Sequence, residues 1–399
     1  GVAWAVFQSS DVVASNDFGT AACFDPQIAS VQNGESVHAV NGVVLVPITP
    51  VDPTTSFVMA SSRSSSNEPA DSAVQVRLSG GGTEIELLRA TDNGTPPAIT
   101  VDWSIVEYTC GVSVQRGTLV GDGTDQLDIA ISGIDTSASF ALVSSAAEAT
   151  ATAFDSDDLF ISELADASTL RIRTAAGVPI SVQRTFAWQV VTFSDPADAV
   201  VQTIDATLGA GATTTTVALP TPADPRTTVL VGTAAAATSG PDIGERLVRT
   251  HLIDSSTLEV TRGVGGDALD VSVQVVTLKD GTTVRHGIVD FDPAQPVKTV
   301  TIEPVDPSRS TAVSTVAIPA LTGGGLTAHV ADDVVGEASA TFALTDAETL
   351  SVARDATASS ASFAWQVIEW AGPSWWDPSY TFRQRIDIDT EAVAAPDAY

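Results

Sequence analysis

The segment Thr-Phe-Ala-Trp-Gln-Val-Val-Thr-Phe at 185–193 recurs almost unchanged as Ser-Phe-Ala-Trp-Gln-Val-Ile-Glu-Trp at 362–370. Weaker copies stand at 100–108 (Thr-Val-Asp-Trp-Ser-Ile-Val-Glu-Tyr) and at 270–278 (Asp-Val-Ser-Val-Gln-Val-Val-Thr-Leu). The fourth residue of each copy is aromatic or apolar, with spacings of 85, 85 and 92 residues: Trp103, Trp188, Val273 and Trp365. A near-constant period of this length indicates one structural unit used several times.

Two further landmarks recur with the same period. Asp166, Asp254 and Asp346 each stand three residues before a Thr-Leu pair, between apolar runs. In such turns the Asp side chain bonds the backbone two residues on, so each landmark predicts a β-hairpin. A second Asp precedes each central residue by 49 to 59 positions, at Asp52, Asp135, Asp224 and Asp306. The common order predicts four repeats at 31–109, 110–196, 197–279 and 280–371, flanked by an N-terminal segment 1–30 and a C-terminal stub 372–399.

Short apolar runs separated by Gly, Pro, Asp and Asn predict an all-β fold of tandem β-sandwich, Ig-like modules of about 85 residues. Each module is expected to hold six or seven strands. The four central residues named above are then core residues of the repeats, with Val273 as a smaller substitute, because burial of a Trp contributes a few kcal/mol. The alternative is that the three tryptophans stack on sugars.

The charge of the chain limits its partners. The formal net charge is −31, the isoelectric point is near 4.1, and Lys279 and Lys298 are the only lysines. Binding to a nucleic-acid backbone needs clustered Lys and Arg, so nucleic acid is excluded as a natural partner. The acidic surface fits either adaptation to salty water or simple solubility.

No run approaches the ~20 apolar residues needed to span a bilayer, so no membrane span is expected. No signal peptide is visible at Gly1, which favours a processed chain, located outside the cell or on its surface. The two cysteines, Cys23 and Cys110, are predicted to form a disulfide that ties the N-terminal segment to the first repeat. The alternative is two separate buried thiols.

The first seven residues form a doubly apolar strand pattern. Val2, Trp4 and Val6 fall on one face, and Ala3, Ala5 and Phe7 fall on the other. A strand of this kind at a chain end needs burial within a sheet, either in its own first repeat or, by strand addition, in a neighbouring molecule.

The stretch from Ala5 to Ala21 contains Phe7-Gln-Ser-Ser-Asp11 and then Asn16-Asp-Phe18-Gly-Thr20. It resembles the start of mature TasA- and camelysin-type secreted proteins over about twenty residues. The resemblance implies export, a β-sandwich fold and matrix fibres in which the N-terminal strand of one subunit completes the sheet of the next.

The C-terminal stub reads Trp375-Trp376-Asp-Pro-Ser-Tyr380-Thr-Phe382-Arg-Gln-Arg385-Ile-Asp-Ile-Asp389. It resembles the opening strand of a bacterial cell-surface domain of unknown function. Either a downstream domain has been removed, or the stub is a docking strand. Phe382, Ile386 and Ile388 share one face of that strand and are a candidate second assembly element.

No enzyme is expected, because the four histidines lie in no nucleophile or metal spacing and no phosphate loop or dinucleotide fingerprint occurs. No cofactor is expected either. The acidic stretches Asp122–Asp128 and Asp155–Asp158 could ligate Ca²⁺, although neither has the twelve-residue loop pattern, and solvated acidic turns are the alternative.

The sequence therefore predicts a secreted structural subunit that polymerises with itself into an extracellular filament, such as a biofilm matrix fibre. Assembly would proceed by donor-strand complementation from the N-terminal strand. The alternative is a monomeric repeat stalk or adhesin that binds glycans, matrix components or another cell surface.

Overall fold

The computed structural model describes residues 26–371, apart from 67, 91–95, 148–150, 152, 237–241, 319–320, 323 and 332–333. Strands dominate the described residues, and the single α-helix among them, α1 (Pro69–Ser72), is one turn long. The all-β prediction is confirmed. None of the described helices is long and apolar enough to cross a membrane.

The strands fall into four units, which are named here by their order in the chain. The first contains β1 (Gln27–His38), β2 (Gly42–Pro47), β3 (Ser56–Ser64), β4 (Val74–Leu78), β5 (Glu84–Arg89) and β6 (Ile99–Cys110). The second contains β7 (Val112–Val120), β8 (Gln126–Ala130), β9 (Ser139–Ala146), β10 (Ile161–Asp166), β11 (Thr169–Arg173) and β12 (Thr185–Phe193). The third contains β13 (Ala199–Leu208), β14 (Thr214–Ala218), β15 (Thr228–Ala236), β16 (Val248–Asp254), β17 (Thr257–Arg262) and β18 (Leu269–Leu278).

The fourth unit contains β19 (Thr283–Phe291), β20 (Val297–Thr301), β21 (Ser310–Ser314), β25 (Thr341–Leu344), β26 (Thr349–Ala353) and β27 (Ala361–Glu369). Three short strands are inserted after β21: β22 (Ala317–Ile318), β23 (Leu321–Thr322) and β24 (Leu326–Thr327). Short 3₁₀ helices occur in the connections: η1 (Thr136–Ala138), η2 (Ser156–Asp158), η3 (Pro225–Thr227), η4 (Ile243–Glu245), η5 (Pro307–Arg309) and η6 (Val335–Ala338).

Every unit repeats one antiparallel topology. Its first, last and third strands form one sheet, in the orders β1-β6-β3, β7-β12-β9, β13-β18-β15 and β19-β27-β21. Its second, last-but-one and fourth strands form another sheet, in the orders β2-β5-β4, β8-β11-β10, β14-β17-β16 and β20-β26-β25. Apolar residues of the two sheets pack against each other, as a β-sandwich requires.

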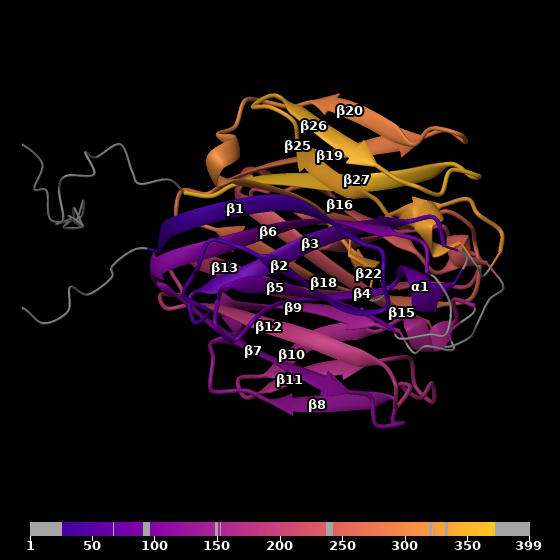
Figure 1. The fold of residues 1–399 in the computed structure, drawn as a ribbon, viewed down its shortest axis with the longest axis horizontal. Helices are drawn as coiled ribbons and strands as arrows, with labels where there is room; N and C mark the ends of the chain where they lie inside the picture. Colours follow the sequence, from indigo (N-terminus) through magenta and orange to yellow (C-terminus); the bar gives the residue numbers. More distant parts are fainter. Residues whose placement is uncertain are drawn as a thin grey trace, which may run out of the picture.

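The units are arranged in a closed ring rather than in a row. The sheets that contain β6, β12, β18 and β27 line the inside of the ring and are called the inner sheets; the last of them has β24 as a fourth strand. The sheets that contain β5, β11, β17 and β26 are called the outer sheets. One central cluster of buried apolar side chains has members from all four units, including Phe57 of the first and Trp370 of the fourth. The ring closes where β1 contacts β21 and η5. In Figure 1 the fourth unit lies at the top, the second at the bottom, and the first between them.

The inner strands therefore have two apolar faces, one for each core. In β12, Phe186 and Val190 point into the sandwich of their own unit, whereas Val191 and Phe193 point into the central cluster. This double burial explains the nearly continuous apolar runs of the repeated segment, since a half-exposed strand would alternate with polar residues.

Local turn chemistry sets the hairpins. The backbone N–H groups of Ser168, Ser256 and Glu348 donate to the carboxylates of Asp166, Asp254 and Asp346 at 2.7 to 2.8 Å. The predicted hairpin turns are thus confirmed. The other recurring Asp caps the turn before the third strand: Thr54, Ser137, Arg226 and Ser308 donate their N–H groups to Asp52, Asp135, Asp224 and Asp306.

Each unit also buries at least one arginine: Arg89 in the first, Arg184 in the second, Arg246 and Arg262 in the third, and Arg354 in the fourth. Arg262 donates to five backbone carbonyls in the surrounding loops. Arg184 instead forms a buried ion pair with Asp158. Charge-assisted bonds of this kind hold the loops at the end of each sandwich in one conformation.

Candidate functional site

Each of the three predicted core tryptophans packs its indole against a glycine of the neighbouring strand. Gly34, Gly117 and Gly287 are the cross-strand partners of Trp103, Trp188 and Trp365. A Cβ atom on any of these glycines would come within 2.3 to 2.7 Å of the indole. Trp365 is buried, whereas Trp103 and Trp188 are half-buried.

The third unit has replaced both members of this pair. Buried Val273 faces Ile204, which stands where the other units have glycine. The smaller central residue, valine in place of tryptophan, thus has a larger cross-strand partner, isoleucine in place of glycine. The total volume between the first and last strands is conserved, although neither position keeps its residue type.

Consecutive units are joined by a glutamine carboxamide. Gln189 of the second unit accepts a hydrogen bond from the Val58 N–H (2.9 Å) and donates to the Val58 carbonyl (3.0 Å) at the edge of the preceding inner sheet. Gln274 does the same with Ala141 at 2.7 and 2.9 Å, and Gln366 with Leu230 at 3.0 and 2.8 Å. All three glutamines are buried, and each directly follows the central residue of its repeated segment, Trp188, Val273 or Trp365. They satisfy backbone groups that an edge strand would otherwise leave open.

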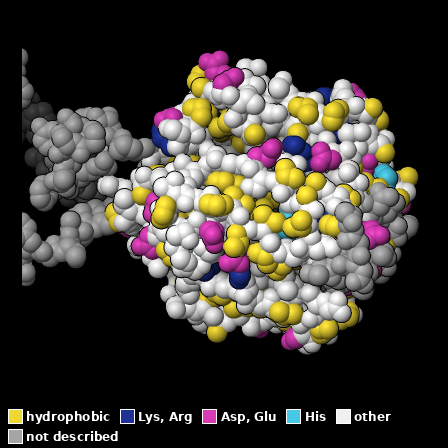
Figure 2. All heavy atoms as spheres, in the orientation of Figure 1, with side chains coloured by type: hydrophobic (Ala, Val, Ile, Leu, Met, Phe, Trp, Pro, Cys, Tyr) yellow, Lys and Arg dark blue, Asp and Glu magenta, His cyan; other side chains and the backbone are white. Residues whose placement is uncertain are grey.

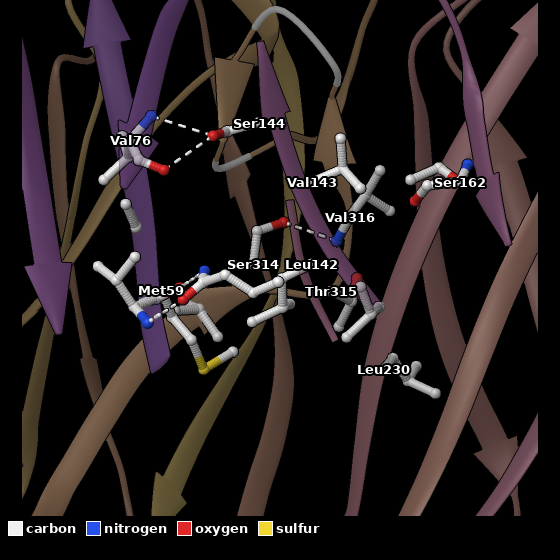
Figure 3. Close-up of a pocket in the computed structure, with 16 residues that line it drawn as sticks. Met59, Val76, Leu142, Val143, Ser144, Ser162, Leu230, Ser314, Thr315 and Val316 are labelled. Carbon is white, nitrogen blue, oxygen red and sulfur yellow. Dashed lines mark hydrogen bonds between the residues drawn. The ribbon is translucent and has the colours of Figure 1, made fainter. Parts of the chain in front are cut away.

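A second set of contacts runs round the complete ring. A hydroxyl in the third strand of each unit, or directly after it in the fourth unit, bonds backbone atoms of the fourth strand of the preceding unit. The four pairs are Ser144 with Val76, Thr233 with Ser162, Thr315 with Thr250 and Ser61 with Phe342. Figure 3 shows the Ser144 hydroxyl between the N–H and the carbonyl of Val76. Because the Ser61 contact joins the fourth unit to the first, the ring is closed by the same chemistry that joins its other units.

A third contact between units is made by the residue that directly precedes each glycine of the glycine–tryptophan pairs. Arg116 donates to the carbonyls of Pro53 and Ser56, and His286 donates to the Thr228 carbonyl at 2.7 Å. Asn33 donates to the Ser310 carbonyl at 2.9 Å, across the joint between the fourth unit and the first. Burial lowers the pKa of His286 to about 4 despite this hydrogen bond, so its imidazole is neutral near pH 7.

The joint between the fourth unit and the first, called the closing joint here, departs from the other three. Ser104 stands where they have glutamine, and its hydroxyl donates to the Asn33 side-chain oxygen at 2.6 Å instead of reaching the facing strand. Asp102, on the same face of β6, stands where the other units have alanine or serine (Ala187, Ser272 and Ala364).

A cavity of about 350 Å³ lies at this closing joint. Its walls include Asp102, Trp103 and Ser104 of β6, and Ala312 of β21. Met59, Phe342 and Leu344 supply an apolar surface. The corresponding cavity between the first and second units, beside Gln189 and Arg116, measures about 240 Å³. The closing joint is therefore the roomier of the two.

The electrostatics of the closing joint are set by two carboxylates and one guanidinium. Burial raises the pKa of Asp102 to about 6, and the charge of Glu35, its cross-strand partner, adds to the shift. Arg63 and a hydrogen bond with Thr341 oppose it. Arg63 also lies 3.1 Å from Asp355 and 3.8 Å from Glu35, so its charge is shared among several acids.

A smaller cavity of about 70 Å³ lies on the ring axis. The third strands of all four units line it, and Figure 3 shows Met59, Leu142, Leu230 and Val316 converging on it. Its lining is mainly aliphatic. It is best described as a packing gap where four edge strands meet.

The acidic stretches that could ligate Ca²⁺ are engaged in local structure. Among the described residues one group of three carboxylates is compact enough for a metal ion, at Asp155, Asp157 and Asp158. Asp158 is paired with buried Arg184, and the Asp155 side chain caps η2. In the other stretch Asp122 bonds Thr124, and Asp128 pairs with Arg171. Asp122, Asp128, Asp155 and Asp158 are thus engaged in hydrogen bonds or ion pairs with neighbouring residues.

The ring leaves one edge of each outer sheet open. The second strands β2, β8, β14 and β20 pair on one side only and make no hydrogen bond to another unit among the described residues. The outward positions of β2 are Val43 and Leu45, both 52% exposed. The equivalent pairs are more polar: Gln126 and Asp128, Thr214 and Thr216, Val297 and Thr299. Four of the ten exposed large hydrophobics in the described part of the chain fall between 37 and 45.

Several residues singled out from the sequence lie outside the described residues: Val2, Trp4, Val6, Phe7, Cys23, Phe382, Ile386 and Ile388. Cys110 ends β6. The disulfide and both assembly strands therefore remain predictions. The glutamine and hydroxyl contacts were not predicted, although the recurrence of Gln after the landmark in three of four copies was a visible signal.

No family model matches the chain, and a search of curated proteins finds no match either. The ring, its closing joint and its open outer edges are therefore the basis for a functional proposal.

Proposed function

We propose that the chain is a secreted structural subunit that polymerises into an extracellular filament by donating its N-terminal strand to an outer sheet edge of the next subunit. One observation carries the proposal: β2 is an open edge strand with apolar residues on both faces. Val44 and Val46 pack on the sandwich core, and Val43 and Leu45 are exposed.

The donor and the acceptor match in pattern. The segment 1–7 is apolar on both faces by sequence, so a position beside β2 would continue the sandwich core on one side and cover Val43 and Leu45 on the other. The outward pairs of β8 and β14 are polar and that of β20 holds one valine, so each of these edges would leave one face of such a strand on a wholly or partly polar surface. In Figure 2 hydrophobic side chains are scattered over the middle of the molecule, where the outer sheet of the first unit lies in Figure 1.

The rest of the ring supports a structural function. The edges of the inner sheets and the fourth strands face neighbouring units of the same ring, which removes competing sites for strand addition. The net charge of −31 opposes unspecific association of copies. A directed contact such as strand addition is then needed to overcome the repulsion.

Electron microscopy of the full chain and of a variant lacking residues 1–7 tests the proposal. Regular polymers are expected from the full chain, and folded, unassembled rings from the truncated one. Polymers from both would refute strand donation. The alternative, a glycan-binding adhesin, predicts single rings from both proteins and saturable binding on a glycan array.

A further inference from the structure

The other three joints show what the closing joint lacks. In each of them a glutamine side chain presents its oxygen to a backbone N–H and its nitrogen to the carbonyl of the same residue, at 2.7 to 3.0 Å. The receiving residues are Val58, Ala141 and Leu230, at one equivalent position of the third strand. At the closing joint the equivalent position is Ala312 of β21, which pairs with Val367 as Val58, Ala141 and Leu230 pair with the corresponding residues of their own units.

The first unit supplies no carboxamide to Ala312. Ser104 replaces the glutamine, and its shorter side chain is bonded to Asn33 within its own unit. Ser104 and Ala312 instead face each other across the cavity of about 350 Å³, which is large enough for a small ligand.

We propose that this cavity binds a primary carboxamide in the position that glutamine side chains occupy at the other three joints. The proposal does not depend on filament formation, since the cavity is formed by the first and fourth units of one chain.

The geometry selects a primary amide among polar groups. The N–H and the carbonyl of one edge residue point the same way, so the ligand must carry an acceptor and a donor on the same side. A primary amide does so, whereas a trans secondary amide turns its N–H and its oxygen to opposite sides. A carboxylate has no donor and would be repelled by Asp102 and Glu35.

The walls define the remainder of the ligand. Met59, Phe342 and Leu344 favour a short apolar stem, as in the glutamine side chain itself. The two carboxylates tolerate a positive group next to it. The shared chemistry fits either a free small amide or an Asn or Gln side chain of a protein segment that reaches the cavity.

The chain contains a single methionine, Met59, and it lines this cavity. In the full chain labelled with ¹³C-methyl methionine, one methyl resonance therefore reports on the site. Titration with propionamide is expected to shift it saturably, with a dissociation constant in the millimolar range for so small a ligand. Propionate and N-methylpropionamide at the same concentrations are expected to leave it nearly unchanged.

Two variants at one position provide the matched control. In S104Q the new side chain fills the cavity, so the response to propionamide should fall at least tenfold. In S104A the cavity stays open, so the response should persist. A wild-type resonance that ignores propionamide, or that responds equally to propionate, overturns the proposal, and so does an undiminished response in S104Q.

A second arm separates the two sources of the amide. A glutamine residue capped as an acetyl and an N-methylamide group carries its only primary amide in the side chain. If it binds more tightly than propionamide, the site serves a protein side chain. If only propionamide binds, the site serves a free small amide. Binding of neither ligand contradicts the proposal.

Discussion

Gly117 and Trp188 are cross-strand partners in β7 and β12, and the indole takes the space that a Cβ at position 117 would need, 2.7 Å away. The same pairing holds in the first and fourth units, and in the third Ile204 and Val273 replace it together. The two positions thus behave as one packing unit.

The pair can be tested by exchange. G117I should destabilise the protein by about 1–3 kcal/mol through overpacking, and W188V by about 3 kcal/mol through the cavity it leaves. The double variant reproduces the natural pair of the third unit and should be more stable than the sum of the two losses predicts. Urea unfolding in a double-mutant cycle measures this coupling, which should exceed about 1 kcal/mol. Additive losses would contradict the account.

The glutamine joint gives a second prediction. Q189A should cost about 1–3 kcal/mol of stability, because it leaves the buried N–H and carbonyl of Val58 without their partner. The control is Q115A, whose carboxamide makes the same pair of bonds to the backbone of Ser132 at an exposed site. Its cost should be about 0.5 kcal/mol or less, since water can replace the lost bonds. Equal costs for the two variants in chemical unfolding would argue against a special role for the joint.

His286 gives a prediction for acid pH. Its pKa is lowered from 6.5 to about 4 by burial, so the unfolded chain binds this proton more readily than the folded one. The stability contributed by the neutral imidazole of His286 is complete above about pH 6.5 and is lost as the pH falls toward 4. Asparagine makes the equivalent bond at the closing joint, through Asn33.

H286N should therefore keep the contact to Thr228 and reduce the loss of stability between pH 6.5 and 4. Thermal unfolding of both proteins across this window checks it. An unchanged pH profile would exclude His286 as a source of acid sensitivity.

Asp102 acts in the opposite direction. Its pKa is raised from 3.8 to about 6, so the folded chain holds this proton more tightly than the unfolded one. Its contribution favours folding below about pH 4 and is lost as the pH rises through 6. D102N should stabilise the protein by roughly 2–3 kcal/mol at pH 7.5 and have little effect at pH 4. Unfolding curves at both pH values test this, and a gain of equal size at pH 4 would assign the effect to something other than charge.

The sequence allowed the all-β class and the hairpin turns to be predicted, because both depend on local patterns. The carboxylates of Asp166, Asp254 and Asp346 bond their own turns, and no distant contact is involved. Ile85, Leu87 and Arg89 alternate with period two, a pattern that predicts a strand with these three side chains on one face. This pattern does not reveal that Arg89 is fully buried, since the carbonyls that bind it belong to His38 at the end of β1 and to Pro97, and the pattern determines the position of neither.

The ring could not be predicted in the same way. It is held by side chains that bond backbone atoms of a neighbouring unit, and every residue type offers such atoms, so the receiving strand leaves no trace in the sequence. The closing joint was hidden for a related reason. In the sequence, Ser104 is only one of several differences in a weaker copy of the repeated segment. Its position opposite Ala312 shows that the serine leaves one joint without the glutamine contact.

The open edge at β2 leads to the central claim, and electron microscopy of two matched variants tests it most directly. V43Q/L45D gives β2 the outward residues of β8, and V297Q/T299D makes the same change on β20 in the fourth unit. The account predicts that the first variant stays folded but forms no filaments, while the second assembles like the unaltered chain. Filaments of normal length and number from V43Q/L45D would contradict it.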